Sequence, residues 1–167
     1  MFTIEDGGGV VGANSYISVG DATDYLTLRY PSNISSWSDL SNAIQESYLV
    51  QATSEIDNYL YCYDIDSYRS TQGLVFPASY TIYDATGRDL GRLPVILRNA
   101  VCELAYYYIS NEIHNDVNYQ FSSVEMGDIK INYKDIGENI TPDIPLHIAK
   151  MLHRICRKSN RSLLRVY

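Results

Sequence analysis

The sequence contains few of the residues from which disulfide frameworks and metal sites are built. It has three cysteines and three histidines in 167 residues, spread widely along the chain. They are Cys62, Cys102, Cys156, His114, His147 and His153. The cysteines form no CxxC pair and the histidines no HxxxH pair, the spacings that bring two ligands to one side of a metal. We therefore predict no disulfide framework and no metal site, with thiols that are buried or incidental.

Long apolar runs are also missing. No stretch approaches the roughly 20 apolar residues that a membrane-spanning helix needs. The first residues, Met1 to Asp6, lack the basic and then apolar layout of a secretory signal. With 46% apolar residues, the chain is long enough for one domain with a hydrophobic core and too short for two comfortable ones. We expect a soluble, intracellular protein of one domain, without membrane contact.

Motifs that carry catalysis or cofactor binding are absent as well. The sequence has no Gly-x-Ser-x-Gly elbow and no paired-carboxylate motif. The triple glycine at 7–9 lacks the Gly-Lys-Ser/Thr ending of a phosphate loop. The loop aspartates Asp64, Asp66, Asp84 and Asp89 are more typical of turn caps than of catalysis. We predict a protein that is not an enzyme and needs no cofactor.

Positive charge is scarce outside the C-terminal end. The net charge is −7, which argues against a chain built to coat nucleic acid, because phosphates repel an acidic surface. Residues 1–143 hold all 20 acidic residues and seven basic ones, whereas residues 144–167 hold six basic residues and no acidic one. We therefore divide the chain into an acidic body, residues 1–143, and a C-terminal helix with a basic arm, residues 144–167.

Two helices are predicted in the first third of the chain. Ser18 followed by Asp21 is typical of a helix start and predicts a helix over about 18–30. Apolar residues at steps of four predict a second helix over about 38–61. This row consists of Leu40, Ile44, Tyr48, Ala52, Ile56 and Leu60.

A third helix follows an irregular stretch. In residues 63–93, glycines and prolines interrupt short apolar pieces, which predicts a long ordered loop with brief strand pairing around 81–83. Pro94 suits the first turn of a helix over about 94–110. Glu103 lies off the apolar stripe of this helix, so we expect it to face solvent.

Two alternating runs joined by a two-residue turn predict a β-hairpin over 124–133. The register that such a turn imposes pairs Met126 with Ile129 and Val124 with Ile131, so that one face is apolar. This face needs a cover, because a lone hairpin is only marginally stable in water. The cover is either the chain's own helices or a neighbouring subunit. The candidate subunit-interface residues are Val124, Met126, Ile129, Ile131 and Tyr133.

The last predicted helix opens at Thr141 or Asp143, carries Pro145 in its first turn and reaches about residue 159. Its apolar side is formed by Ile144, Ile148, Met151, Leu152 and Ile155. Another side carries basic residues at intervals of three or four. The candidate docking residues of this arm are Lys150, Arg154, Arg157, Lys158, Arg161, Arg165 and Tyr167. A solvated helix face, docking to an acidic partner and contact with nucleic acid are the three interpretations that stay open.

These elements together predict a mainly α fold. It is a small bundle of about four helices with one β-hairpin and a long ordered loop.

Several short segments in a fixed order resemble a phage family often labelled DnaT-like single-stranded-DNA-binding protein. The likeness begins with the sequence from Val11 to Val19, followed by Ala22 and Tyr25. It continues at Phe76-Pro77, Leu93-Pro94, Asn99 to Ala105 and Val124 to Tyr133, and in the basic ending. One departure is Ala78, which stands where the family commonly has an arginine.

Members of this family are similar to the head–tail connector, or adaptor, proteins of tailed phages. The resemblance implies a structural virion protein that forms a ring of twelve copies at the head–tail interface, after a stage in the host cytoplasm. The ring would bind the portal protein, extend the channel for packaged DNA and seat the next neck or tail-completion protein. The basic arm would then dock on the portal. The alternative function is single-stranded-DNA binding by the basic C-terminal helix.

Overall fold

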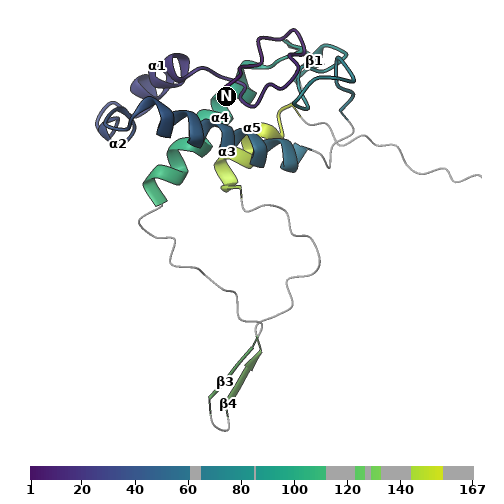
Figure 1. The fold of residues 1–167 in the computed structure, drawn as a ribbon. Helices are drawn as coiled ribbons and strands as arrows, with labels where there is room; N and C mark the ends of the chain where they lie inside the picture. Colours follow the sequence, from purple (N-terminus) through teal and green to yellow (C-terminus); the bar gives the residue numbers. More distant parts are fainter. Residues whose placement is uncertain (61–64, 85, 112–122, 127–128, 133–143, 156–167) are drawn as a thin grey trace, which may run out of the picture.

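The structure is a computed structural model that describes residues 1–60, 65–84, 86–111, 123–126, 129–132 and 144–155 (Figure 1). Five helices and two separate two-stranded sheets lie in these residues. The helices are α1 (Val19–Arg29), α2 (Ser35–Ser38), α3 (Asn42–Leu60), α4 (Val95–Asn111) and α5 (Leu146–Leu152). The strands are β1 (Ile82–Tyr83), β2 (Asp89–Gly91), β3 (Ser123–Met126) and β4 (Ile129–Asn132). The prediction of a small, mainly helical fold with a β-hairpin is confirmed.

Helix α1 begins where the sequence predicts. The Ser18 hydroxyl accepts a hydrogen bond from the backbone N–H of Asp21 at 3.1 Å and donates one to the Asp21 carboxylate at 2.7 Å. This reciprocal cap satisfies one of the N–H groups that every helix start leaves without a partner. Ala22 and Leu26 are buried on the inner side of α1, and the helix ends before Pro31.

Helix α3 begins later than the predicted start near residue 38. Trp37 is buried in the separate short helix α2, where its Nε1 donates to the Thr23 hydroxyl at 2.8 Å. The Trp37 carbonyl accepts a hydrogen bond from the Gln45 side chain at 2.8 Å. These bonds hold the chain in a turn between α2 and α3. The predicted helix over 38–61 therefore corresponds to α3, which runs from Asn42 to Leu60, and the short helix α2 before it was not predicted.

The buried side of α3 matches only the second half of the predicted apolar row. It consists of Gln45, Leu49, Ala52, Thr53, Ile56 and Leu60. Ile44 is exposed and Tyr48 is only half-buried. A row at steps of four drifts around a helix of 3.6 residues per turn, so a straight buried face mixes steps of three and four. The prediction that Leu40 and Ile44 share this face was wrong, because Ile44 is rotated off it and Leu40 lies before the helix begins.

Helix α4 is the centre of the fold and packs against α1, α2, α3 and α5. Its predicted apolar stripe is buried, apart from the half-buried Tyr108. The buried members are Leu97, Ala100, Val101, Leu104 and Ala105. Each fully buried leucine of this kind stabilises the fold by about 2 kcal/mol relative to an exposed one.

The segment between α3 and α4 forms an ordered lobe of short extended pieces. Strands β1 and β2 pair antiparallel, which confirms the brief pairing predicted around 81–83. Before them, Ser67 forms an antiparallel bridge with Ala78, and the Tyr68 N–H donates to the Pro77 carbonyl at 2.8 Å. On the other side, the Ala78 N–H donates to the Arg92 carbonyl at 3.0 Å. Three segments far apart in the loop therefore lie side by side.

The β3–β4 hairpin has the predicted register, with Val124 opposite Ile131 and Met126 opposite Ile129. The two turn residues and Tyr133 lie outside the described residues.

Helix α5 is shorter than predicted. Pro145 stands at its N-cap, one residue before the helix, and the predicted starts at Thr141 and Asp143 lie outside the described residues. After Leu152 the backbone bonds tighten, since the N–H groups of Arg154 and Ile155 donate to carbonyls only three residues back. The predicted end near residue 159 lies outside the described residues. On the inner side, Ile148, Leu152 and Ile155 are buried and Ile144 and Met151 are partly buried, as predicted.

Candidate functional site

The described basic residues at the end of α5 face solvent, with Lys150 in the helix and Arg154 in the turn that follows it. Lys150 and Arg154 are exposed, whereas Ile148 and Leu152 are buried on the opposite side. This is the polarity expected for a helix whose apolar stripe faces a core. The remaining predicted docking residues, Arg157, Lys158, Arg161, Arg165 and Tyr167, lie outside the described residues.

A small groove of about 340 Å³ lies beside this cationic side of α5. It is lined by Leu90, Val95, Ile96, Asn99, Met151 and Arg154. These residues come from β2, the start of α4 and the C-terminal end of α5, so the groove brings Arg154 next to β2. No sequence pattern indicates this proximity, because 64 positions separate Leu90 from Arg154.

Two arginine side chains lie close to one tyrosine ring in the lobe, and one of them, Arg92, directly follows β2. The Arg92 guanidinium carbon lies 4.6 Å from the centre of the Tyr68 ring, and that of Arg69 lies 5.5 Å from it. All three side chains are exposed. Cation–π attraction acts at these distances, and it favours guanidinium groups that stay near the ring instead of moving freely in solvent. We call these three residues the Tyr68 cluster.

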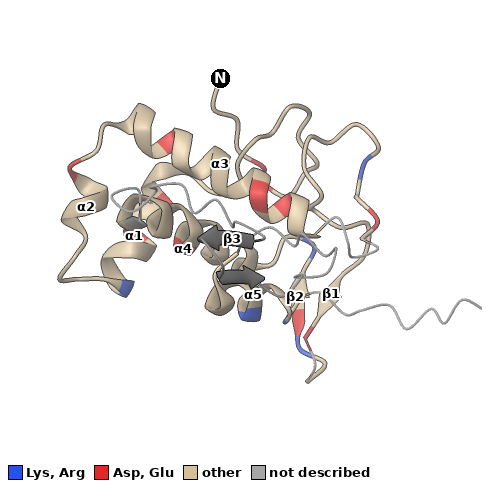
Figure 2. Ribbon diagram, turned by 90° about the horizontal axis from the view of Figure 1, so that it is seen from below, with Lys and Arg blue, Asp and Glu red and all other residues tan. Residues whose placement is uncertain are grey.

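Positive and negative charges are distributed unevenly over the described residues. In Figure 2, blue segments lie on α5 and in the lobe of β1 and β2, where red segments lie beside them, and further red segments mark α3. The described part of the lobe that carries the Tyr68 cluster holds three arginines and three aspartates, so its formal charges balance. They are Arg69, Arg88, Arg92, Asp66, Asp84 and Asp89. The described residues at the end of α5 include Lys150 and Arg154 and no acidic residue.

Glu103 of α4 is buried, which corrects the prediction that it faces solvent. Its side chain is 1% exposed. The hydroxyl of Tyr25 donates to it at 2.7 Å, the hydroxyl of Tyr30 also donates to it, and the Arg29 Nε lies 3.2 Å away. His147 approaches to 4.0 Å from the start of α5. The helical periodicity of the sequence could not show that Glu103 is buried, because the residues that bond to it lie in and just after α1, more than 70 positions earlier.

Glu103 and its partners Tyr25, Arg29 and Tyr30 connect α4 to α1 and the residue at its end through hydrogen bonds. Burial and the bond to Glu103 raise the pKa of Tyr30 to about 12 and that of Tyr25 further above its usual value. Both phenols therefore stay protonated at neutral pH and act as donors. A carboxylate that accepts two phenols and an arginine fixes α1 against α4, and it has no free position for a substrate.

A half-buried acid, Asp57, joins α3 to the lobe. The Asp57 carboxylate accepts a hydrogen bond from the Tyr16 hydroxyl and another from the Val75 N–H at 2.9 Å. The same hydroxyl accepts a bond from the Phe76 N–H at 3.0 Å. Burial raises the pKa of Asp57 to about 6, although the bonds from Tyr16 and Val75 act in the opposite direction. Asp57 therefore ties the position of the 74–78 segment to α3.

The glycine-rich loop near the N-terminus is already occupied by a carboxylate of the chain. Buried Glu5 accepts hydrogen bonds from the N–H groups of Gly7, Gly9 and Val10 at 2.7–2.9 Å. Converging N–H groups of this kind bind anions in phosphate loops. Here the Glu5 side chain takes the place that an external phosphate would need.

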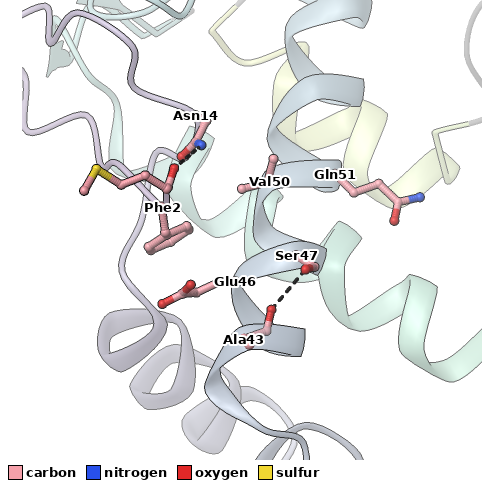
Figure 3. Close-up of a pocket in the computed structure, with 8 residues that line it drawn as sticks. Phe2, Asn14, Ala43, Glu46, Ser47, Val50 and Gln51 are labelled. Atoms are coloured by element: carbon pink, nitrogen blue, oxygen red, sulfur yellow. Dashed lines mark hydrogen bonds between the residues drawn. The ribbon is translucent and has the colours of Figure 1, made fainter.

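A second groove, of about 390 Å³, lies between the N-terminal segment and α3 (Figure 3). Asn14 donates to the Met1 carbonyl at 2.9 Å on one side, and Glu46 and Gln51 of α3 line the other side. The only ionisable side chain among the lining residues is that of Glu46, whose negative charge would repel a phosphate.

Among the described residues, no group of three or more potential metal ligands comes together. Within the same part of the chain, no helix is long and apolar enough to cross a membrane. The one described cysteine, Cys102, is a buried free thiol, and burial raises its pKa to about 12.

The whole chain, residues 1–167, matches the protein family described as "Putative DnaT-like ssDNA binding protein". The chain belongs to this family. No curated protein and no solved structure matches it. The resemblance to a DnaT-like family is thus confirmed, and the family description names single-stranded DNA. None of the comparisons names a portal, a ring or a connector.

For this DnaT-like chain, sequence patterns identified the exposed cations of α5 but missed the Tyr68 cluster. The cluster depends on bonds between segments 66–68, 77–79 and 91–92, which no periodic pattern encodes. One sequence feature could have indicated the cluster: an aromatic residue next to a basic one, Tyr68-Arg69, in the segment predicted to be an ordered loop.

Proposed function

We propose that this protein binds single-stranded DNA, with the exposed cations of α5 as the first contact with the phosphates. The observation that carries the proposal is the exposure of Lys150 in α5 and of Arg154 in the turn that follows it, in a chain whose family description names single-stranded DNA. Both cations lie at the C-terminal end of this helix, where each can contact a phosphate of one strand.

A net charge of −7 is compatible with this function because the charges are segregated. Residues 144–167 carry six basic residues and no acidic one. At physiological salt, charges more than about 8 Å away are largely screened, so a strand held at the basic end senses mainly that end. Affinity should be modest and should fall steeply with salt as counterions are released.

The test is fluorescence anisotropy of a labelled 20-nucleotide oligothymidylate titrated with the full chain at several salt concentrations. The variant combines Lys150→Gln and Arg154→Gln. A control with the same change in net charge combines Ser36→Glu and Ser38→Glu, at exposed positions in α2. We expect the α5 variant to bind more weakly and to lower the slope of log K against log salt by about 1.4, or 0.7 for each lost phosphate contact. Equal affinities of the α5 variant and the control would refute the role of α5.

A second candidate function is the head–tail connector ring. The observation that favours it is the β3–β4 register, which pairs Val124 with Ile131 and Met126 with Ile129 and so aligns four apolar residues on alternate positions. An apolar face of this kind is useful in a ring, where the next subunit covers it. The basic arm would then dock on an acidic portal surface, and packaged DNA would pass an acidic wall without sticking.

Mixing the protein with a phage portal protein, followed by electron microscopy, tests the connector function. A ring of twelve copies on the portal is the expected result. A mixture in which the protein stays separate from the portal, while it binds oligothymidylate, would leave only the DNA-binding function.

A further inference from the structure

We infer that the Tyr68 cluster is a second nucleic-acid contact, which stacks an unpaired base and holds the adjoining phosphate. This inference rests on the proposed DNA-binding function and gives it a site that α5 alone does not supply. Cations on α5 explain attraction to phosphates, but single-stranded DNA differs from a duplex by its free base faces. Proteins that bind single strands combine a basic track with planar groups on which bases stack.

The cluster contains both of those components at one exposed point. Tyr68 is 39% exposed, and the guanidinium carbons of Arg92 and Arg69 lie 4.6 Å and 5.5 Å from its ring centre. Arginine offers a planar surface for stacking and, at its edge, donors that match a phosphate. A base can therefore stack on the ring or on a guanidinium that covers it, while the remaining N–H groups bind the phosphate.

The backbone holds these side chains in place before any ligand arrives. The N–H of Arg69 donates to the Gln72 side chain at 2.8 Å. The N–H of Tyr68 and the carbonyl of Arg92 bond to the adjacent residues Pro77 and Ala78 from opposite sides. Because these positions are fixed in the free protein, binding orders fewer groups, which lowers its entropic cost.

The groove beside α5 reaches the strand that precedes the cluster. It is lined by both Leu90 and Arg154, and Arg92 follows β2 directly. A strand held by Lys150 and Arg154 can thus continue along this groove toward Arg92 and Tyr68. The aspartates of the lobe balance its arginines, so we assign the cluster mainly to stacking and the cations at the end of α5 mainly to phosphate binding.

Two labelled oligomers of equal length separate stacking from charge: oligothymidylate, and an abasic strand that keeps the phosphates but lacks the bases. Wild type should bind oligothymidylate about tenfold more tightly than the abasic strand. Tyr68→Ala should remove most of this preference, and Tyr68→Trp should retain it. Arg69→Lys with Arg92→Lys keeps the charge but not the planar groups, and should also reduce the preference. Tyr107→Ala on α4, where the tyrosine is 38% exposed, is the matched control and should leave it unchanged.

The outcomes distinguish this site from the proposed function. If wild type binds neither oligomer, both the function and the site are refuted. If wild type binds oligothymidylate and the α5 variant is weakened, but the Tyr68 and arginine variants keep the full preference for bases, the cluster alone is refuted. The double lysine variant covers the case in which Tyr68→Ala disturbs the lobe, which circular dichroism would reveal.

Discussion

Replacing Asp57 by asparagine should change how the stability of the protein depends on pH. Burial raises the pKa of Asp57 from 3.8 to about 6 in the folded protein, against the opposing bonds from Tyr16 and Val75. Since the folded pKa is the higher one, the folded state holds this proton more tightly than the unfolded state does. Its stabilising effect is complete below about pH 4 and is lost as the pH rises through 6.

The size of the effect follows from the same two values. A pKa difference between 3.8 and about 6 corresponds to about 3 kcal/mol of unfolding free energy, and this is an upper figure because Asp57 is not completely buried. An asparagine side chain cannot ionise, so Asp57→Asn should carry only a constant cost from altered hydrogen bonding.

Urea unfolding of wild type and Asp57→Asn at pH 4, 5, 6 and 7 measures this difference directly. Groups that titrate equally in both proteins cancel when the two profiles are subtracted. We expect the stability of wild type relative to the variant to fall by about 2–3 kcal/mol between pH 4 and 7. Parallel profiles would refute a raised pKa of Asp57 in the folded protein.

Three further predictions concern buried groups. Glu103→Gln removes the charge that Tyr25, Tyr30 and Arg29 surround, and should lower the unfolding free energy by about 2 kcal/mol, or the melting temperature by roughly 4–8 °C. Asp24→Asn, at an exposed carboxylate on α1, should change the melting temperature little, and equal shifts would contradict the role of Glu103 in joining α1 to α4. Glu5→Gln should lower the unfolding free energy in urea by about 1–3 kcal/mol, because an amide cannot accept hydrogen bonds from the N–H groups of Gly7, Gly9 and Val10 together. An unchanged urea midpoint would contradict this role of Glu5. With Cys62 and Cys156 replaced by serine, Cys102 should react with a disulfide reagent at pH 8 only after unfolding, since burial raises its pKa to about 12; rapid labelling of the native protein would argue against the packing around α4.

Elements defined by local signals were predictable from the sequence. The cap at Ser18 and Asp21 fixed the start of α1, Pro94 marked the start of α4, and the two-residue turn fixed the hairpin register. Each signal acts between residues that are close in the chain, so it needs no knowledge of the tertiary fold.

Features that depend on distant contacts were not predictable. The break between α2 and α3 arises because Trp37 bonds to Thr23 and receives a bond from Gln45. The sequence shows that Glu103 lies off the apolar stripe of its helix, which suggested exposure to solvent. The tyrosines that cover it are Tyr25 of α1 and Tyr30 at the end of α1, and their proximity to Glu103 cannot be read from the sequence. For the candidate site, periodicity found the cations of α5 but could not bring Arg92 and Tyr68 together, because the bonds to Pro77 and Ala78 do that.

The central claim is that this chain binds single-stranded DNA at the side formed by α5 and the Tyr68 cluster. Titration of labelled oligothymidylate with the intact protein at about 50 and 200 mM salt tests it most directly. The account predicts saturable binding at the lower salt that weakens strongly at the higher one, and that is reduced by Lys150→Gln with Arg154→Gln but not by the charge-matched α2 control. Absence of binding at the lower salt would contradict it.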